Sequence, residues 1–279
     1  MPSGSTPGAL PLLLDPAELA EHLDDARVRI VDLSPQDVYA EHHAPGAVHL
    51  PYGAIVRTAP PVGGLLPQPD ELQRTLRAAG IDPDTHVVCM DAEGGGAAGR
   101  LLWTLEAHGH AAGSLVDGGL VAWVNEGFPL EAGPGPSVDA GTIKIARPVA
   151  RVADAEAIMD RLGNEDFLPL DARSAGEYTG ADVRAARGGH IPGAVHYEWT
   201  RAMDRGRNLR LRPFDELRAE LAELGVTPER ETAVYCHTHH RSAFSYAMLR
   251  ALGHERVLGY PGSWSDWGNR DDTPVEMDA

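Results

Sequence analysis

The segment HAPGAVHL at residues 43–50 returns as HIPGAVHY at residues 190–197. Other residue pairs match in the same order along the chain: Asp32 with Asp171, Tyr39 with Tyr178, Gly109 with Gly253, Trp123 with Trp267 and Asn125 with Asn269. The spacing between partners is nearly constant and far longer than the unit of a solenoid repeat. The repeat therefore predicts two copies of one domain fold.

The two copies are separated by residues 132–141, where glycine and proline are too dense to support a regular element. We expect an N-terminal domain over residues 1–132, a linker over residues 133–146 and a C-terminal domain over residues 147–279. A length of 279 residues with 43% hydrophobic content is enough for two domains, each with its own core.

Short apolar runs alternate with helical patterns in each copy. The expected strands are residues 28–31, 86–90, 167–170 and 232–235, and the expected helices include residues 214–224 and 244–252. Strands that alternate with helices predict an α/β fold, in which each domain has a parallel sheet flanked by helices on both faces.

The charge balance excludes several classes of partner. With 41 acidic and 24 basic residues the net charge is −17, which repels nucleic acid unless a local basic patch exists. The one candidate, Arg201–Arg212, has no aromatic side chain for base stacking, so we interpret it as a solvated loop or an anion-facing rim. No apolar run approaches the roughly 18–20 residues of a membrane span, and residues 9–14 lack the basic flank of a secretory signal.

The cysteine content favours a reducing environment. Cys89 and Cys236 are the two cysteines of the chain, too few for a disulfide framework or a four-sulfur zinc site. We therefore expect a cytoplasmic protein. Cys89 lies inside an expected strand and is interpreted as a buried, inert thiol.

The strand–helix junction after Tyr235 carries the distinctive side chains. They are Cys236, His237, Thr238, His239, His240, Arg241 and Ser242. A cysteine there meets the positive end of a helix and the N–H groups of a curled loop, and both lower the pKa of a thiol. Arg241 and any protonated histidine add to this effect, and Ser242 can cap the helix. The pattern indicates a nucleophilic thiolate.

Two other interpretations of Cys236 remain open from the residues alone. One is a plain buried thiol, although a loop rich in histidine and arginine is a poor place for it. The other is a metal site made by Cys236, His237, His239 and His240. Ligands crowded into so short a stretch cannot easily surround a tetrahedral ion, because structural zinc sites draw on separated pairs.

Three motifs resemble the tandem-domain rhodaneses, the thiosulfate and 3-mercaptopyruvate sulfurtransferases. Residues 39–47, YAEHHAPGA, are similar to the first family signature, and residues 189–194, GHIPGA, to the turn of the second domain. Residues 260–267, YPGSWSDW, are similar to the C-terminal signature, with Asp266 where glutamate is usual. The resemblance covers nearly the whole chain. It implies catalysis in the C-terminal domain alone, with Asp91 at the matching position of the N-terminal domain.

The resemblance implies that a sulfane sulfur passes from thiosulfate to a thiophile such as cyanide through a Cys236 persulfide, with no metal or organic cofactor. It also implies substrate-binding roles for the residues around the thiol: His237, Thr238, His239, His240, Arg241, Ser242, Arg173 and Asp171. Arg241 is expected to hold the sulfonate or sulfite group through its planar fork. Asp171 is expected to face a loop histidine or Arg241, or to act only as a turn former at the end of its strand.

The loop leaves the substrate open. His237-Thr238 matches neither the Arg-Lys pair usual in two-domain thiosulfate enzymes nor the Gly-Ser pair usual in mercaptopyruvate enzymes. A 3-mercaptopyruvate sulfurtransferase is therefore an alternative, as is a carrier that passes persulfide to a protein partner. A dual-specificity phosphatase is a third alternative. It is disfavoured because those enzymes have one more residue between cysteine and arginine than separates Cys236 from Arg241.

Overall fold

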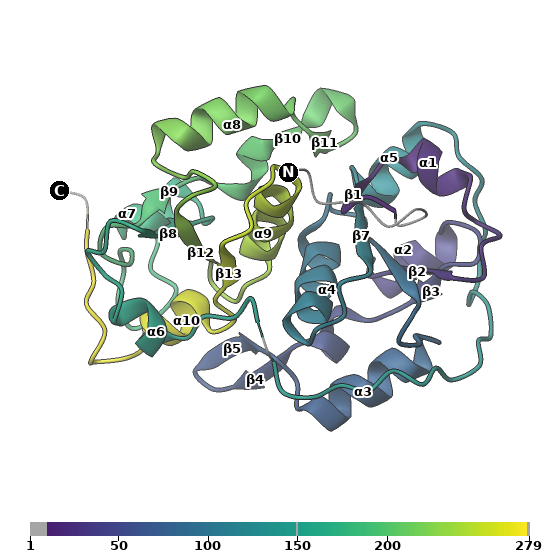
Figure 1. The fold of residues 1–279 in the computed structure, drawn as a ribbon, viewed down its shortest axis with the longest axis horizontal. Helices are drawn as coiled ribbons and strands as arrows, with labels where there is room; N and C mark the ends of the chain where they lie inside the picture. Colours follow the sequence, from purple (N-terminus) through teal and green to yellow (C-terminus); the bar gives the residue numbers. More distant parts are fainter. Residues whose placement is uncertain (1–9, 149, 278–279) are drawn as a thin grey trace.

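The computed structural model describes residues 10–148 and 150–277, and each half of it contains one main parallel β-sheet (Figure 1). The first sheet has the order β1 (Leu13–Leu14), β7 (Gly113–Val116), β6 (His86–Met90), β2 (Val28–Asp32), β3 (Val48–His49). The second has the order β13 (Val257–Gly259), β12 (Glu231–Tyr235), β8 (Phe167–Asp171), β9 (Val195–His196). Every pair of neighbouring strands in both sheets is parallel, which confirms the predicted α/β class.

Helices cover both sheets. The first domain has α1 (Pro16–Ala20), α2 (Gln36–Glu41), α3 (Pro69–Ala78), α4 (Gly96–Ala107) and α5 (Gly119–Asn125). The second has α6 (Ala155–Met159), α7 (Ala175–Thr179), α8 (Phe214–Glu223), α9 (Arg241–Ala251) and α10 (Ser263–Trp267). Two hairpins, β4 (Arg57–Ala59) with β5 (Val62–Leu65) and β10 (Met203–Asp204) with β11 (Arg210–Leu211), and the 3₁₀ turns η1 (Tyr52–Ile55), η2 (Trp199–Ala202) and η3 (Arg205–Arg207) complete the fold.

The predicted strands and helices are confirmed with small shifts at their ends. Residues 86–90 form β6, and residues 232–235 lie within β12. The predicted helix at residues 244–252 is most of α9, but α9 begins earlier, at Arg241. We call residues 236–240, between β12 and α9, the catalytic loop, because they begin at the predicted nucleophile Cys236. This loop is short, because the helix starts only a few residues after the strand ends.

The two domains meet through α4 and α9, which lie side by side at the centre of the molecule (Figure 1). A Cβ atom at Gly99 would lie 2.9 Å from the carbonyl oxygen of Ala243, so glycine is needed for this close approach. Trp103 of α4 and Phe244 of α9 belong to the same buried apolar cluster. The domains therefore share a core rather than a wet interface.

The segment predicted as a linker packs against the first domain. Ile143 and Ile145 are buried, and the N–H of Ile143 donates to the carbonyl of Ile81 (3.2 Å). The Arg77 side chain in α3 donates in turn to the carbonyl of Ile143 (2.8 Å). We call residues 142–145 the strap, because they lie along the first domain and hydrogen-bond to it, although the composition of the segment is typical of a flexible linker.

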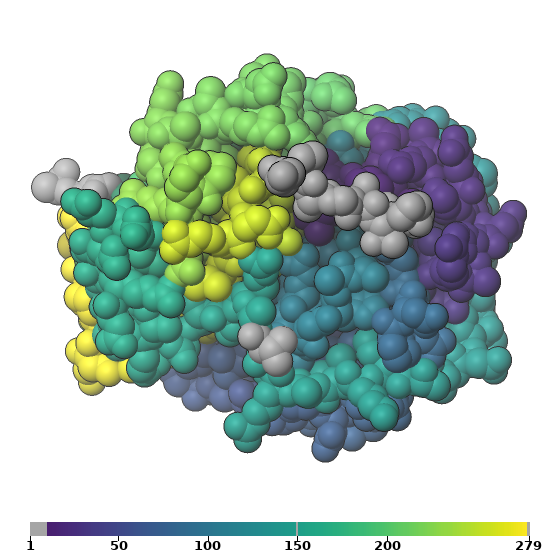
Figure 2. Space-filling model, viewed as in Figure 1, coloured from purple at the N-terminus to yellow at the C-terminus, as the bar shows by residue number. Residues whose placement is uncertain are grey.

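The basic stretch at residues 201–212 turns out to join the domains. Arg210 bridges to Asp15 (2.7 Å) and Glu126 (2.6 Å) of the first domain and lies 3.7 Å from Asp117. In the space-filling view, the green segment lies against the purple N-terminal part of the chain (Figure 2). The interpretation of this stretch as a solvated loop or anion rim is wrong for Arg210, whose charge is neutralised inside the molecule.

Candidate active site

The loop between β12 and α9 begins at Cys236, at the carboxyl end of the second sheet. The Ser263 hydroxyl accepts the N–H of Cys236 (3.2 Å), and the N–H of Trp264 donates to the Cys236 carbonyl (3.0 Å). His239 has a φ of 53°, a left-handed conformation that curls the loop. The predicted nucleophile therefore stands on a loop that is anchored at its first residue and bent at its middle.

The surroundings of Cys236 favour the thiolate. The residue is only 1% exposed, and burial alone would raise its pKa. The positive charge of Arg241 acts in the opposite direction, as do hydrogen bonds from the Ser242 side chain and from the N–H groups of Ser242 and Thr238. The result is a Cys236 pKa below its ordinary value, which is the condition for a reactive thiol.

Arg241 is held by a buried carboxylate that the sequence reasoning missed. Its two terminal nitrogens donate to the two carboxylate oxygens of Glu177 (2.6 and 2.9 Å). Glu177 is 1% exposed; burial raises its pKa, but the hydrogen bond and charge of Arg241 prevail and lower the pKa to about 2. Arg241 therefore keeps a fixed position beside the thiol, with part of its fork already occupied.

A sequence signal for Glu177 did exist. Ser174 and Glu177 form the capping box of α7: the hydroxyl of Ser174 accepts the N–H of Glu177, and the carboxylate reaches back to the N–H of Ser174. Read by itself, S-x-x-E indicates only the start of a helix. The same carboxylate serves both the helix start and Arg241, which becomes visible only when α7 and the loop are placed together.

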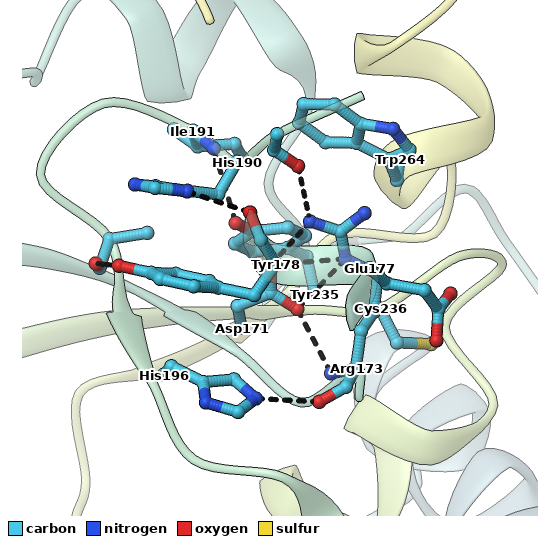
Figure 3. Close-up of polar contacts among 12 residues, drawn as sticks. Asp171, Arg173, Glu177, Tyr178, His190, Ile191, His196, Tyr235, Cys236 and Trp264 are labelled. Atoms are coloured by element: carbon cyan, nitrogen blue, oxygen red, sulfur yellow. Dashed lines mark hydrogen bonds and ion pairs between the residues drawn. The ribbon is translucent and has the colours of Figure 1, made fainter. Parts of the chain in front are cut away.

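Asp171 and Arg173 form a buried pair behind the loop (Figure 3). Arg173 donates to Asp171 from Nε and from a terminal nitrogen (2.6 Å) and to the carbonyl of Gly189 (2.7 Å). Its guanidinium lies over the ring of Trp264 (4.4 Å) and near that of Tyr235 (5.6 Å). Both side chains are 1% exposed or less. The structure thus pairs Asp171 with Arg173 rather than with a loop histidine or Arg241, and keeps Arg173 away from solvent.

Burial keeps two of the loop histidines, His237 and His239, in the neutral form. Burial lowers the pKa of His239 well below its ordinary value and also lowers the pKa of His237. His239 is fully buried against Trp103, and its Nδ1 lies 2.7 Å from the Ser242 hydroxyl. A neutral His239 that donates from Nδ1 leaves the Ser242 proton free to point to Cys236. His239 therefore contacts Ser242, whose side chain in turn hydrogen-bonds to Cys236.

The third loop histidine, His240, is paired with a carboxylate of the other domain. Its Nε2 lies 2.6 Å from the carboxylate of Glu93, in the loop that precedes α4. Burial alone would lower the pKa of His240, but Glu93 outweighs it and raises the pKa. The edge of the Tyr52 ring also packs against His240, with ring centroids 5.2 Å apart. The N-terminal domain thus favours the protonated form of His240 in the catalytic loop.

This interdomain pair predicts a pH-dependent stability. The raised pKa of His240 means that its contribution is complete below its ordinary value of 6.5 and is lost as the pH rises through the folded value. The lowered pKa of Glu93 means that its contribution is present above 4.5 and is lost as the pH falls through the folded value. Glu93→Gln should therefore lower the melting temperature most between those two values.

The expected loss is about 1–3 °C near pH 5.5, because a partly exposed pair contributes up to about 1 kcal/mol. It should shrink by pH 8.5, and thermal unfolding at both pH values measures it. Glu41→Gln, which alters an exposed carboxylate at the end of α2, is the control. An equal loss for Glu93→Gln at both pH values would contradict the assignment.

Arg100 of α4 supports the catalytic loop from the first domain and was not predicted. This fully buried side chain donates to the carbonyls of His239 (3.2 Å) and Thr238 (3.4 Å), and to that of Gly64 (2.7 Å) in the β4–β5 hairpin. Burial lowers the pKa of Arg100 to about 10, so it remains a cation at neutral pH. One buried cation thus holds the backbone of the loop from behind.

The matching loop of the first domain contains no thiol. The carboxylate of Asp91 accepts the N–H groups of Glu93 (3.0 Å), Gly95 (2.8 Å) and Ala98 (2.8 Å), so the loop binds an anion of its own. Cys89 is fully buried in β6, and burial raises its pKa. The first domain therefore contributes contacts with the catalytic loop, while its own thiol is un-ionised.

Two other kinds of site were sought in the described residues, a metal cluster and a membrane span. Among residues 10–148 and 150–277, no three His, Cys, Asp or Glu side chains come together in an arrangement that could hold a metal ion. None of the helices in the described part of the chain has the length and apolar character needed to cross a bilayer.

The family described as "Rhodanese-like domain" matches the chain twice, over residues 15–126 and 154–270. The chain therefore belongs to the rhodanese family, which confirms the resemblance seen in its motifs. The two matches lie within the two predicted domains.

Individual relatives and one solved structure are similar to this chain over most of its length. A protein named thiosulfate sulfurtransferase from Azotobacter vinelandii is 42% identical over 270 residues, covering 96% of this chain and 98% of the relative. A 3-mercaptopyruvate sulfurtransferase from Escherichia coli is 30% identical, covering 92% of this chain and 95% of the relative. The solved structure of YnjE has the same fold, with a TM-score of 0.85 at 23% identity, covering 96% of this chain and 68% of that one.

Proposed function

We propose that this protein is a thiosulfate sulfurtransferase that carries the transferred sulfur on Cys236. The observation that carries the proposal is the lowered pKa of a cysteine surrounded by backbone N–H donors and an arginine. The relative from Azotobacter vinelandii, matched along almost its whole length, supports the same activity. Small-molecule donor and acceptor are the expected partners.

In the first step, the Cys236 thiolate attacks the outer sulfur of thiosulfate. An S–S bond forms to Cys236, the S–S bond within thiosulfate breaks, and sulfite leaves with the electron pair. The terminal sulfur of the new persulfide carries the negative charge, where the N–H groups of Thr238 and Ser242 and the charge of Arg241 can stabilise it.

In the second step, the carbon of cyanide attacks the terminal sulfur of the persulfide. A C–S bond forms, the S–S bond to Cys236 breaks, and thiocyanate leaves while the thiolate is restored. Because the donor product leaves before the acceptor reacts, the initial rates should show ping-pong kinetics. Measuring thiocyanate at several fixed cyanide concentrations tests this, and intersecting double-reciprocal lines would contradict the mechanism.

We also propose how the remaining predicted site residues act. His237 is half-buried at the start of the loop and borders the approach to the thiol. His240 adds positive charge from the far side of the loop, whereas His239 orients Ser242. Asp171 and Arg173 act as positioning residues, because their fully buried pair supports the loop from below. A cytoplasmic location fits two cysteines that are both free.

The second candidate activity uses 3-mercaptopyruvate as donor, and the relative from Escherichia coli favours it. The same thiolate would attack the substrate sulfur in both reactions, so Cys236 does not distinguish them. The two donors compared by kcat/KM, with cyanide as common acceptor, separate the candidates. We expect thiosulfate to be preferred, because Arg241 is suited to an oxyanion of sulfur.

Arg241→Ala should lower kcat/KM for thiosulfate by about 10- to 100-fold, the equivalent of about 1.5–3 kcal/mol for a charge-assisted contact. The variant is best made together with Glu177→Gln, since a buried carboxylate without its partner would destabilise the fold. Arg184→Ala is the matched control, because Arg184 lies 3.8 Å from Glu177 but is 56% exposed. Unchanged kinetics in the double variant would show that Arg241 has no part in donor use.

A further inference from the structure

A cavity of about 550 Å³ lies in the first domain. It lies at the carboxyl end of the first sheet, between the start of α2, the turn η1 and the loop after β6. Residues that define it include Leu33, Ser34, Val38, Tyr52, Asp91 and Glu93. We refer to it as the N-terminal cavity.

The N-terminal cavity occupies the position that corresponds to the catalytic loop in the repeat. Ser34 and Arg173 each donate their N–H to the aspartate that ends the preceding strand, at 2.8 and 2.9 Å. Val38 stands in the first domain where Glu177 stands in the second. Gly96 opens α4, as Arg241 opens α9.

The difference in side-chain size explains why a cavity exists on one side only. Arg173, Glu177 and Arg241 fill the second domain at this place with two bound ion pairs. Serine, valine and glycine replace these three long side chains in the first domain. Shorter side chains at these three positions therefore leave space in the first domain that the charged groups fill in the second.

The walls of the cavity select against anions. None of the described residues that line it is lysine or arginine, and two carboxylates, Asp91 and Glu93, are among them. The Asp91 carboxylate is already satisfied by three backbone N–H groups, and Glu93 is paired with His240. Much of the remaining wall is apolar, as at Leu33 and Val38. A thiosulfate-like ligand would find no lysine or arginine in this wall.

One hydroxyl group in the wall lacks a partner. Within the described residues, the buried hydroxyl oxygen of Tyr52 has no hydrogen-bond partner. Burial raises the pKa of Tyr52 to about 12, so this hydroxyl keeps its proton. Buried polar groups are normally hydrogen-bonded, and a ligand with an acceptor atom would satisfy this hydroxyl. Exposed Pro35, Gln36 and Pro51 line the opening to solvent.

We propose that the N-terminal cavity is a binding site for a compact, uncharged organic molecule with an apolar ring or chain and at least one hydrogen-bonding oxygen or nitrogen. The apolar body packs against Leu33 and Val38, and its polar atom bonds to the hydroxyl of Tyr52. The cavity borders the loop that begins at Cys236, because Tyr52 and Glu93 both contact His240. The proposed ligand does not take part in the sulfur transfer, so the proposal does not depend on that activity.

Two probes of similar shape and different charge test the proposal. They are 2-naphthol, which is neutral at pH 7, and 2-naphthoate, which is an anion. Saturation-transfer NMR and calorimetry on the full chain should show one saturable site for 2-naphthol and at least tenfold weaker binding of 2-naphthoate. Val38→Phe should weaken 2-naphthol binding at least tenfold by filling the cavity. Its sulfurtransferase activity should stay close to that of the wild type, because Val38 lies in α2 of the first domain and Cys236 lies in the second.

Val124→Phe in α5 is the matched control, since Val124 is also partly buried but does not line the cavity. Ala92→Leu fills the cavity from another wall and serves if Val38→Phe does not fold. Weakening by either filling variant, with the control unaffected, supports the proposal. Absence of saturable 2-naphthol binding, equal binding of 2-naphthoate, or binding that survives the filling variants would overturn it.

Discussion

Cys236→Ser should abolish sulfur transfer, with kcat/KM reduced at least about 1,000-fold, because a serine hydroxyl is not ionised at neutral pH and cannot form a persulfide. The fold should persist, since the hydroxyl is nearly isosteric with the thiol and the loop donors remain. After incubation with thiosulfate alone, the intact mass of the wild-type protein should rise by one sulfur atom, and cyanide should remove it. Cys236→Ser should show neither change.

Cys89 provides the internal control for this experiment. It is fully buried in a central strand, and burial raises its pKa, whereas the pKa of Cys236 is lowered. Iodoacetamide near neutral pH should therefore modify Cys236 and leave Cys89 intact until the protein unfolds. Cys89→Ser should keep its activity. Extra sulfur mapped to Cys89, or normal turnover by Cys236→Ser, would overturn the mechanism.

Arg100→Met should have the next largest effect, on both stability and catalysis. The change removes hydrogen bonds to the carbonyls of Thr238, His239 and Gly64 and leaves those buried acceptors unpaired. We expect about 3 kcal/mol of lost stability, and a melting temperature lower by roughly 6–12 °C. Because the carbonyls of Thr238 and His239 belong to the catalytic loop, alkylation of Cys236 at neutral pH should also slow by at least about tenfold.

The matched control is Arg77→Met, which removes an arginine that also donates to backbone carbonyls, those of Thr142 and Ile143 in the strap. This variant should lose some stability while Cys236 keeps its reactivity. Arg100→Lys should recover part of both losses, because the charge remains but the planar fork does not. A normal melting temperature and a normal alkylation rate in Arg100→Met would show that the hydrogen bonds from Arg100 to the catalytic loop are unimportant.

The strands and the position of Cys236 could be predicted because they depend on residues that are close together in the sequence. A strand that ends at Tyr235, followed by a thiol and a helix, places Cys236 without knowledge of any distant contact, and the repeat places Asp91 opposite it. The strands are similarly local, since apolar runs between turn residues define them.

The unpredicted part depends on contacts between residues far apart in the chain. Arg100 meets the loop at Thr238 and His239, and Glu93 meets it at His240, yet neither residue stands out in its own segment. Arg173 was expected near the substrate because its segment borders the loop. The spacing from Asp171 to Arg173 does not reveal that the two side chains pair with each other in a buried position.

The clamp made by Arg100 bears on how such a duplicated gene can evolve. A copy that has lost its nucleophile is ordinarily free to drift, or to be deleted. Here the N-terminal domain, which has no thiol in its loop, carries the Arg100 cation that hydrogen-bonds to the catalytic loop of the other domain. In addition, a side chain at Gly64 would overlap the backbone of Thr238. Natural selection on the thiol therefore acts also on α4 and on the β4–β5 hairpin. Recombination that exchanged one half for that of a distant relative would separate parts that have to change together.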